Sequence, residues 1–190
     1  MVELEQKILA EGEVLPGNIL KVGSFLNQQL DVAFLLKMGE EIKRLYKNDN
    51  VTKILTVESS GIAIAVAAAA CMNVPVVFAK KNRSGNVSGD VYTANVMSFT
   101  HGKAYDIMVA KEYLHSGETI LIVDDFLACG NALKGLIKIC NDAGANVAGC
   151  AIAIEKGFQH GGDELRESGI RVESLAIVDS MEDCKITYRH

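Results

Sequence analysis

Two consecutive carboxylates, Asp124 and Asp125, follow a run of apolar residues and precede a short loop of small residues. The segment reads ILIVDDFLACGNALKG over residues 120–135. The backbone N–H groups of such a loop, with the first turn of the helix that follows, form a cradle for a phosphate group. Paired carboxylates beside it could accept hydrogen bonds from the vicinal hydroxyls of a sugar. This pattern fits a sugar phosphate, although a routine turn with helix-capping aspartates has the same spacing.

Polar and basic residues also follow three other apolar segments. ESSG (58–61) follows KILTV, Lys80 and Lys81 follow VPVVFA, and Lys156 follows a run that ends at Ile154. If these segments are parallel strands, their carboxyl ends meet at one edge of the sheet, where such sheets bind ligands. A lysine pair is more often a solvated strand end, and ESSG could be a simple helix cap. Their shared position favours one site.

The apolar pattern predicts the strands and helices that would position these residues. Continuous Val, Ile and Ala runs indicate strands buried on both faces, as in a parallel sheet with helices on both sides. The expected strands are 53–57, 74–79, 119–123, 146–154 and 171–178, and the expected helices are about 2–11, 61–72, 130–142 and 161–168. The predicted fold class is therefore α/β.

Two regions depart from this alternation. The stretch between about residue 12 and Leu30 is expected to be irregular, and Asp31 is expected to cap the helix that follows. The apolar face expected for that helix is Val32, Leu35, Leu36, Ile42 and Leu45. Residues 91–98 and 105–111 alternate apolar and polar side chains around the turn-like sequence THGK, which predicts a two-stranded ribbon outside the sheet.

The composition excludes several classes of protein. A chain of 190 residues, 49% hydrophobic and 23% charged, is expected to form one globular domain. A net charge of −5 offers no surface for nucleic acid or an anionic membrane, so neither is an expected partner. The longest apolar stretch, 62–72, is too short to span a membrane, and the five cysteines form no C-x-x-C pair. Without a secretory signal, the expected location is cytoplasmic.

The segment VDDFLACGNA resembles the 5-phosphoribosyl pyrophosphate (PRPP) binding signature of the type I phosphoribosyltransferases. The resemblance implies the fold of that family over residues 1–190. This fold has a small hood, mainly at about 12–30 plus C-terminal elements, and a flexible β-ribbon at about 82–111. It implies that Asp124 and Asp125 are the catalytic carboxylates. The PRPP-binding residues that it implies are Ala128, Cys129, Gly130, Asn131, Ala132, Ser59, Ser60 and Lys81.

The chain departs from the family pattern inside the loop. Many members have threonine at the positions of Cys129 and Ala132, so only backbone donors remain there for the phosphate. Several members that act on oxopurines have an aspartate, proposed as a general base, where this chain has Ala128. No base is therefore visible in the loop. Asp125, Glu155 and the acidity of the purine itself remain as alternatives.

Segments along nearly the whole chain resemble the bacterial xanthine phosphoribosyltransferases. These segments are ILKVGSFLNQQLD (19–31), VESSGIA (57–63), FAKKNRS (78–84), YTANVMSFT (92–100) and IEKGFQHGGDEL (154–165). The base-binding residues that this resemblance implies are Leu20 and Asn27 in the hood, Lys156 at an exocyclic oxygen, and Phe158. A cationic donor suits the oxygens of xanthine and would repel the amino group of adenine. Phe158 either stacks on the purine or packs under the loop.

The reaction implied is transfer of the 5-phosphoribosyl group from PRPP to N9 of xanthine. It yields xanthosine monophosphate (XMP) and pyrophosphate, as in purine salvage. Mg²⁺ is expected to arrive on the pyrophosphate, without a metal site of the protein. The family resemblance also implies a homodimer.

Two other functions stay open at this point. One is transfer to guanine, hypoxanthine or adenine, and the other is a regulator that senses PRPP without turning it over. A regulator would need a basic DNA-binding segment, which the N-terminal 50 residues lack. His101 and His160 lie in glycine-flanked segments and are expected at the surface.

Overall fold

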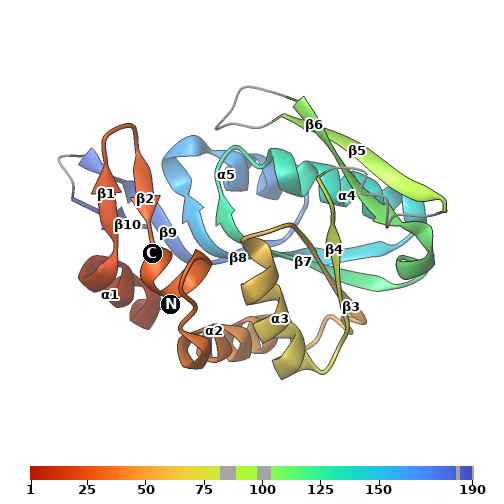
Figure 1. Ribbon diagram of the computed structural model, residues 1–190, viewed down its shortest axis with the longest axis horizontal. Coiled ribbons are helices and arrows are strands. Elements are labelled where there is room, and N and C mark those ends of the chain that lie inside the picture. Colours follow the sequence, from red (N-terminus) through yellow and green to blue (C-terminus); the bar gives the residue numbers. More distant parts are fainter. Residues whose placement is uncertain (82–88, 98–103, 183–184, 190) are drawn as a thin grey trace.

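The computed structural model describes residues 1–190 apart from 82–88, 98–103, 183–184 and 190 (Figure 1). Its helices are α1 (Val2–Glu11), α2 (Val32–Leu45), α3 (Gly61–Met72), α4 (Asn131–Ala143) and α5 (Gly161–Glu167). Its strands are β1 (Glu13–Leu15), β2 (Ile19–Lys21), β3 (Lys53–Val57), β4 (Val76–Ala79), β5 (Val91–Met97), β6 (Ala104–Ala110), β7 (Thr119–Leu127), β8 (Asn146–Lys156), β9 (Val172–Ser180) and β10 (Thr187–Tyr188). The predicted THGK turn, with His101, lies outside the described residues.

The main sheet has six strands in the order β10-β9-β8-β7-β3-β4. Strands β4, β3, β7, β8 and β9 are parallel, and the short edge strand β10, which the sequence pattern did not predict, is antiparallel. The predicted α/β class with a parallel sheet is confirmed. The strand order places β7 at the centre, with β3 and β8 on its two sides.

Helices cover both faces of this sheet (Figure 1). Strand side chains alternate between two core clusters: Leu121 and Val123 pack with residues of α1, α2 and α3. Ile120 and Ile122 pack with residues of α4 and of the ribbon β5–β6. Both faces of β7 are therefore apolar, which explains its continuous Ile, Leu and Val run. No helix among the described residues is long and apolar enough to span a membrane.

The sequence pattern predicted an irregular stretch at 12–30, and this prediction was wrong. Strands β1 and β2 form an antiparallel hairpin, with Gly17 (φ 85°) and Asn18 (φ 59°) in its turn. A π-helical segment, Gly23–Asn27, follows. Strands of three residues are too short to show a period of two, and a π-helical segment of five residues is too short to show a helical period, so the pattern missed both. We call residues 12–30 the hood region.

Helix α2 begins as predicted, but its buried face differs. The Asp31 carboxylate accepts a hydrogen bond of 3.1 Å from the Phe34 N–H, which confirms it as the N-cap. Val32 and Leu36 are 62% and 44% exposed, so their assignment to the buried face was wrong. The buried residues are Phe34, Leu35, Met38, Gly39 and Ile42. Phe34 points inward because its ring packs edge-on against Phe25 of the π-helical segment, with centroids 6.1 Å apart.

Strands β7 and β8 both run further than the sequence indicates. Strand β7 continues through the two aspartates to Leu127, and β8 continues to Lys156. The two strands pair as far as Phe126 with Ile154 and Leu127 with Glu155. Asp124 and Asp125 therefore lie within a strand and not in the loop after it. The hydrogen-bond ladder of the central sheet fixes their backbone.

The predicted ribbon is present as β5 and β6, which pair from Val91 with Ala110 to Met97 with Ala104. One face of this ribbon, which includes Ala94 and Val96, packs on the side of α4 away from the sheet. The ribbon thus forms an outer layer at one end of the molecule (Figure 1).

Candidate active site

Asp125 is the point at which three parts of the chain meet. Its carboxylate is 5% exposed. One oxygen accepts a hydrogen bond of 3.0 Å from Ser60 Oγ, just before α3, and the other accepts one of 3.3 Å from Asn27 Nδ2 of the π-helical segment. Asn27 and Ser60, which are 98 and 65 positions from Asp125 in the sequence, thereby bind one carboxylate. The structure brings together Asn27, Ser60 and Asp125, which the sequence had placed in three separate groups.

Asp124 lies beside it and is 7% exposed. One of its carboxylate oxygens accepts a hydrogen bond of 3.0 Å from the Asp125 N–H. Burial, and then the charge of Asp125, raise the pKa of Asp124 well above its usual value, while Lys81 acts in the opposite direction. Two adjacent carboxyl groups in such different environments can bind a pair of vicinal hydroxyls. An ionised group accepts a hydrogen bond from a hydroxyl, and a protonated group can donate one to it.

The loop Ala128–Gly130 joins β7 to α4. Gly130 has φ 77°, in the left-handed region that glycine adopts readily, and this turns the chain into the helix. The first backbone N–H groups of α4 have no partner within the helix itself, as at any helix start, so they are available to an anion. The side chain of Asn131 points elsewhere, because its Nδ2 donates to the Met97 carbonyl oxygen of the ribbon at 3.1 Å. Asn131 and Ala132 thus offer backbone donors, as do Ala128 and Cys129.

The segment after β3 faces the same edge of the sheet. Ser59 and Ser60 are both exposed, and the Glu58–Ser59 peptide bond is cis. Glu58 accepts a hydrogen bond of 2.6 Å from the backbone N–H of Lys81, which ties this loop to the end of β4. Lys81 itself is exposed, with its ammonium 5.7 Å from the Tyr105 ring centroid. The sequence offered no signal for the role of Glu58, because its partner is 23 positions away.

Lys156 lies at the end of β8, under the hood region. Its ammonium donates a hydrogen bond of 3.0 Å to the Asn18 carbonyl oxygen and lies 5.9 Å from the Phe126 ring centroid. Burial lowers the pKa of Lys156. Sequence reasoning missed Phe126, although it directly follows Asp125 and continues the strand. A partly buried cation above an aromatic ring forms one wall of a site for a flat, electron-rich ligand.

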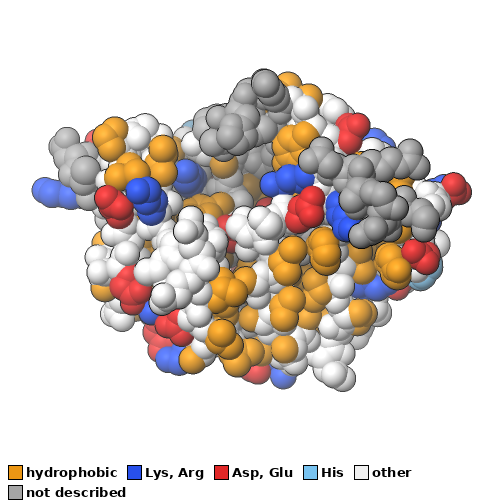
Figure 2. Space-filling model, in the orientation of Figure 1, with side chains coloured by type: hydrophobic (Ala, Val, Ile, Leu, Met, Phe, Trp, Pro, Cys, Tyr) orange, Lys and Arg blue, Asp and Glu red, His pale blue; other side chains and the backbone are white. Residues whose placement is uncertain are grey.

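The other predicted base-binding residues lie on the same side of the sheet. Leu20 of β2 is 7% exposed, and Phe158 is half-buried against the core cluster that includes α1 and α2. Phe158 belongs to a short 3₁₀ turn, Gly157–Gln159, directly after Lys156. In Figure 2 the surface is hollowed between the hood region and the rest of the molecule, with acidic and basic side chains at the margin.

Glu155 is not available as a general base. Its carboxylate is 1% exposed, and both oxygens accept hydrogen bonds from the Arg166 guanidinium, at 2.9 and 2.6 Å. A carboxylate that is paired in this way and closed off from solvent cannot reach a substrate. His160 is exposed, as expected, and its Nδ1 lies 3.4 Å from Asp163.

Comparison with known proteins identifies the family. The family described as "Phosphoribosyl transferase domain" matches residues 27–179. A xanthine phosphoribosyltransferase of Ruminiclostridium cellulolyticum is 53% identical over 185 residues, covering 97% of each chain. Another from Bifidobacterium longum is 54% identical and covers 100% of each chain.

A solved structure has the same fold at low sequence identity. The adenine phosphoribosyltransferase of Trypanosoma brucei, in complex with AMP, pyrophosphate and ribose-5-phosphate, aligns with a TM-score of 0.78 and 18% identity. The alignment covers 98% of this chain and 85% of that one. This likeness concerns the fold alone. Since relatives more than half identical match along nearly their whole length, the chain belongs to the phosphoribosyltransferase family, in the group of the bacterial xanthine phosphoribosyltransferases.

Proposed function

We propose that this protein transfers the 5-phosphoribosyl group of PRPP to N9 of xanthine, giving XMP and pyrophosphate. The observation that carries this proposal is the convergence on Asp125. Asn27 of the predicted hood and Ser60, a predicted PRPP-binding residue, both bind the carboxylate that precedes the phosphate loop. The relatives named xanthine phosphoribosyltransferase support the choice of base.

Each part of the site has a role in this reaction. The backbone N–H groups of residues 128–132 bind the 5′-phosphate, and Asp124 and Asp125 hold the ribose hydroxyls. The negative charge of Asp125, and that of Asp124 when it is ionised, offsets the positive charge that develops on the sugar as the bond from C1 to pyrophosphate breaks and that from C1 to N9 forms. The exposed groups Ser59, Ser60 and Lys81 bind the pyrophosphate. Mg²⁺ enters with the pyrophosphate, whose oxygens it prefers as ligands.

The base binds between the hood region and the end of β8. Lys156 donates to an exocyclic oxygen of xanthine, and Leu20 and Phe158 supply apolar contact. When the ribose hydroxyls bind the Asp125 carboxylate, Asn27 gives up its hydrogen bond to Asp125 and binds the base instead. Because Glu155 is already paired, the proton at N9 leaves through the ionisation of xanthine itself, or through Asp125.

Adenine is less compatible with Lys156. An ammonium accepts no hydrogen bond, so it repels the exocyclic amino group of adenine. Guanine and hypoxanthine carry an exocyclic oxygen as xanthine does, so for these bases the relatives named xanthine phosphoribosyltransferase support the choice. A regulator that only senses PRPP would need none of the base-side contacts.

The test is nucleotide formation by the purified protein with PRPP, Mg²⁺ and each of xanthine, guanine, hypoxanthine and adenine. We expect a kcat/KM for xanthine that exceeds those of the other bases by about tenfold or more. Preference for another base would keep the reaction and overturn the specificity. PRPP binding without turnover on any base would favour the sensor, and DNA binding in a salt titration would then be measured.

We further propose a homodimer located in the cytoplasm. Hydrophobic side chains gather over α3 and α2 in Figure 2, and Leu36, Val66 and Phe78 are 44%, 52% and 41% exposed. An exposed apolar surface of this kind is typical of an interface between subunits. The cysteines that the structure describes, Cys71, Cys129, Cys140 and Cys150, are all free thiols, as in reducing compartments.

A further inference from the structure

The start of α5 lies directly against the phosphate loop. An added Cβ on Gly161 would come within 2.5 Å of the Cys129 carbonyl carbon and 2.6 Å of the Gly130 nitrogen. Only glycine therefore allows α5 to approach the backbone of the loop so closely. An exposed ion pair of 2.7 Å between Lys134 and Glu164 also joins α4 to α5. The position of α5 thus determines how far the loop can move toward the sheet edge.

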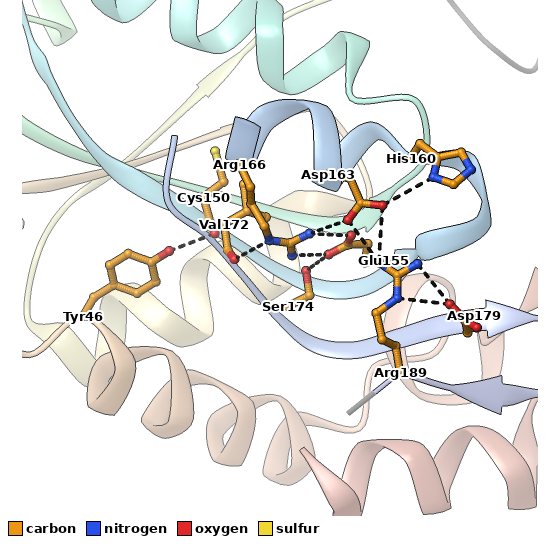
Figure 3. Close-up of polar contacts among 10 residues, drawn as sticks. All are labelled: Tyr46, Cys150, Glu155, His160, Asp163, Arg166, Val172, Ser174, Asp179 and Arg189. Atoms are coloured by element: carbon orange, nitrogen blue, oxygen red, sulfur yellow. Dashed lines mark hydrogen bonds and ion pairs between the residues drawn. The ribbon is translucent and has the colours of Figure 1, made fainter. Parts of the chain in front are cut away.

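The next residue of α5 faces an ion pair between the buried Glu155 and the partly exposed Arg166. An added Cβ on Gly162 would lie 2.5 Å from Glu155 Cδ and 2.8 Å from Arg166 Nη1. Glu155 is a residue of β8, and the bidentate contact with Arg166 of α5 is shown in Figure 3. Ser174 of β9 donates a further hydrogen bond to the same carboxylate. The pair therefore fixes α5 to two strands of the sheet.

Arg166 has further partners that restrict its position. Its Nε donates to the Val172 carbonyl oxygen at 3.2 Å, and its Nη1 lies 3.4 Å from an Asp163 oxygen. Asp163 in turn accepts a hydrogen bond of 3.0 Å from Arg189, near the C-terminus (Figure 3). A partly buried ion pair adds little stability compared with apolar side chains of the same volume, but its paired hydrogen bonds impose one geometry. The pair therefore fixes the position of α5 more than it stabilises the fold.

We propose that the Glu155–Arg166 pair is a positioning device for the phosphate loop. The pair holds the first turn of α5 through Gly162, and α5 holds the backbone of residues 128–130 through Gly161. In the proposed function neither Glu155 nor Arg166 has a contact with the substrate, because their charged groups are already paired with each other. The inference rests on the proposed function for the identity of the ligand, a phosphorylated ribose.

Four variants test this inference: Glu155→Gln, Arg166→Lys, Gly162→Ala and Gly161→Ala. The first three disturb the ion pair, and the last presses on the loop without touching the pair. All four are expected to raise the KM for PRPP about tenfold, with a smaller change in the KM for xanthine. By calorimetry without any base, the Kd of ribose 5-phosphate rises by a similar factor and that of pyrophosphate stays unchanged.

Tyr46→Phe is the matched control. It removes the hydrogen bond of 2.9 Å from the buried Tyr46 hydroxyl to the Cys150 carbonyl oxygen, on the same strand but away from the loop (Figure 3). It is expected to lower the melting temperature and leave ribose 5-phosphate binding unchanged. If Gly162→Ala and Glu155→Gln behave like Tyr46→Phe, the pair is merely structural and the inference is wrong.

The calorimetry also separates this inference from the proposed function. Ribose 5-phosphate binding needs no purine base, so absence of turnover with xanthine would reject the function and leave the positioning test intact. If Glu155→Gln does not fold, Gly162→Ala and Arg166→Lys still decide, because both retain the buried carboxylate.

Discussion

At the scale of single residues, the site separates two adjacent carboxyl groups by their environments. Asp125 has two hydrogen-bond donors, Ser60 and Asn27, whereas Asp124 is buried beside a second carboxylate with little to offset the repulsion. The raised pKa of Asp124 means that the folded protein holds a proton there more tightly than the unfolded chain does. Asp124 therefore lowers the stability of the folded state whenever it is ionised.

Replacing this group gives a prediction with a definite sign. Below the ordinary pKa of aspartate, protonated Asp124 makes its full contribution to the free energy of unfolding of the wild-type protein. This contribution is lost as the pH rises through the raised pKa. Asp124→Asn carries no charge and can still accept the Asp125 N–H. We expect its melting temperature to exceed that of the wild type at pH 8, by a margin that shrinks toward pH 5. A margin independent of pH would show that Asp124 is ionised throughout.

Replacing Lys156 tests its predicted contact with the base. A hydrogen bond to a charged group contributes about 1.5–3 kcal/mol, so Lys156→Met should lower kcat/KM for xanthine by about 10- to 100-fold. The KM for PRPP should change little, because the lysine lies under the hood region. Since burial lowers the pKa of Lys156, its removal should not destabilise the fold. Unchanged kinetics with xanthine would mean that the Asn18 carbonyl keeps the ammonium away from the base.

At the scale of elements, the hood region depends on one lysine of α1. The ammonium of Lys7 lies 5.3 Å from the Phe25 ring centroid and 5.2 Å from that of Phe34. It also pairs with Glu11 at 2.8 Å and with Asp31 at 3.0 Å. Lys7 thereby joins α1, the π-helical segment and the start of α2. The same π-helical segment ends at Asn27.

Lys7→Met should loosen that segment without altering the sugar side of the site. We expect the KM for xanthine to rise about fivefold and the KM for PRPP to change less. Lys37→Met is a suitable control, because Lys37 also joins α2 to α1, through an exposed pair of 3.9 Å with Glu3. An equal rise in the two KM values would instead indicate a general loss of order.

The elements that the sequence predicted well are those with a long, uniform period. The expected bounds of helices 2–11 and 61–72 match α1 and α3, and strand 53–57 matches β3. The sequence pattern failed where the extent of an element depends on a strand that is distant in sequence. Strand β7 continues past Asp125 only because β8 pairs with it there, and no local signal reports that.

The candidate site also has one part that the sequence could predict and another that it could not. The motif around the aspartates is contiguous, so a family resemblance could assign its roles from the sequence, and these roles stay predictions. The Glu58 contact with Lys81 and the Glu155–Arg166 pair join residues whose spacing matches no known motif. Glu155 even looked like a candidate base, because a sequence shows a carboxylate but not what already occupies its oxygens.

At the scale of the whole molecule, the exposed apolar surface over α2, α3 and β4 is the candidate interface of the proposed homodimer. Val66 lies on the side of α3 away from the sheet and is 52% exposed. Val66→Glu would place a charge at the centre of a buried interface, where an unpaired charge is very unfavourable. Light scattering should then give half the wild-type mass.

Leu9→Glu is the control for this experiment. Leu9 is 60% exposed on α1, at the opposite side of α2, and the same change there should leave the mass unaltered. A dimer that persists with Val66→Glu would place the interface elsewhere.

The central position of β7 has a consequence for how the protein opens. Its residues 120–122 pair with β3 on one side and with β8 on the other, so the hydrogens of their backbone amides should exchange with solvent only when the whole domain unfolds. Among the described residues the hood hairpin forms a separate two-stranded sheet, so it can open locally. The carboxylates that hold the sugar thus lie on the strand that carries the global stability of the protein, whereas Leu20, on the hood hairpin, can detach and return many times without it.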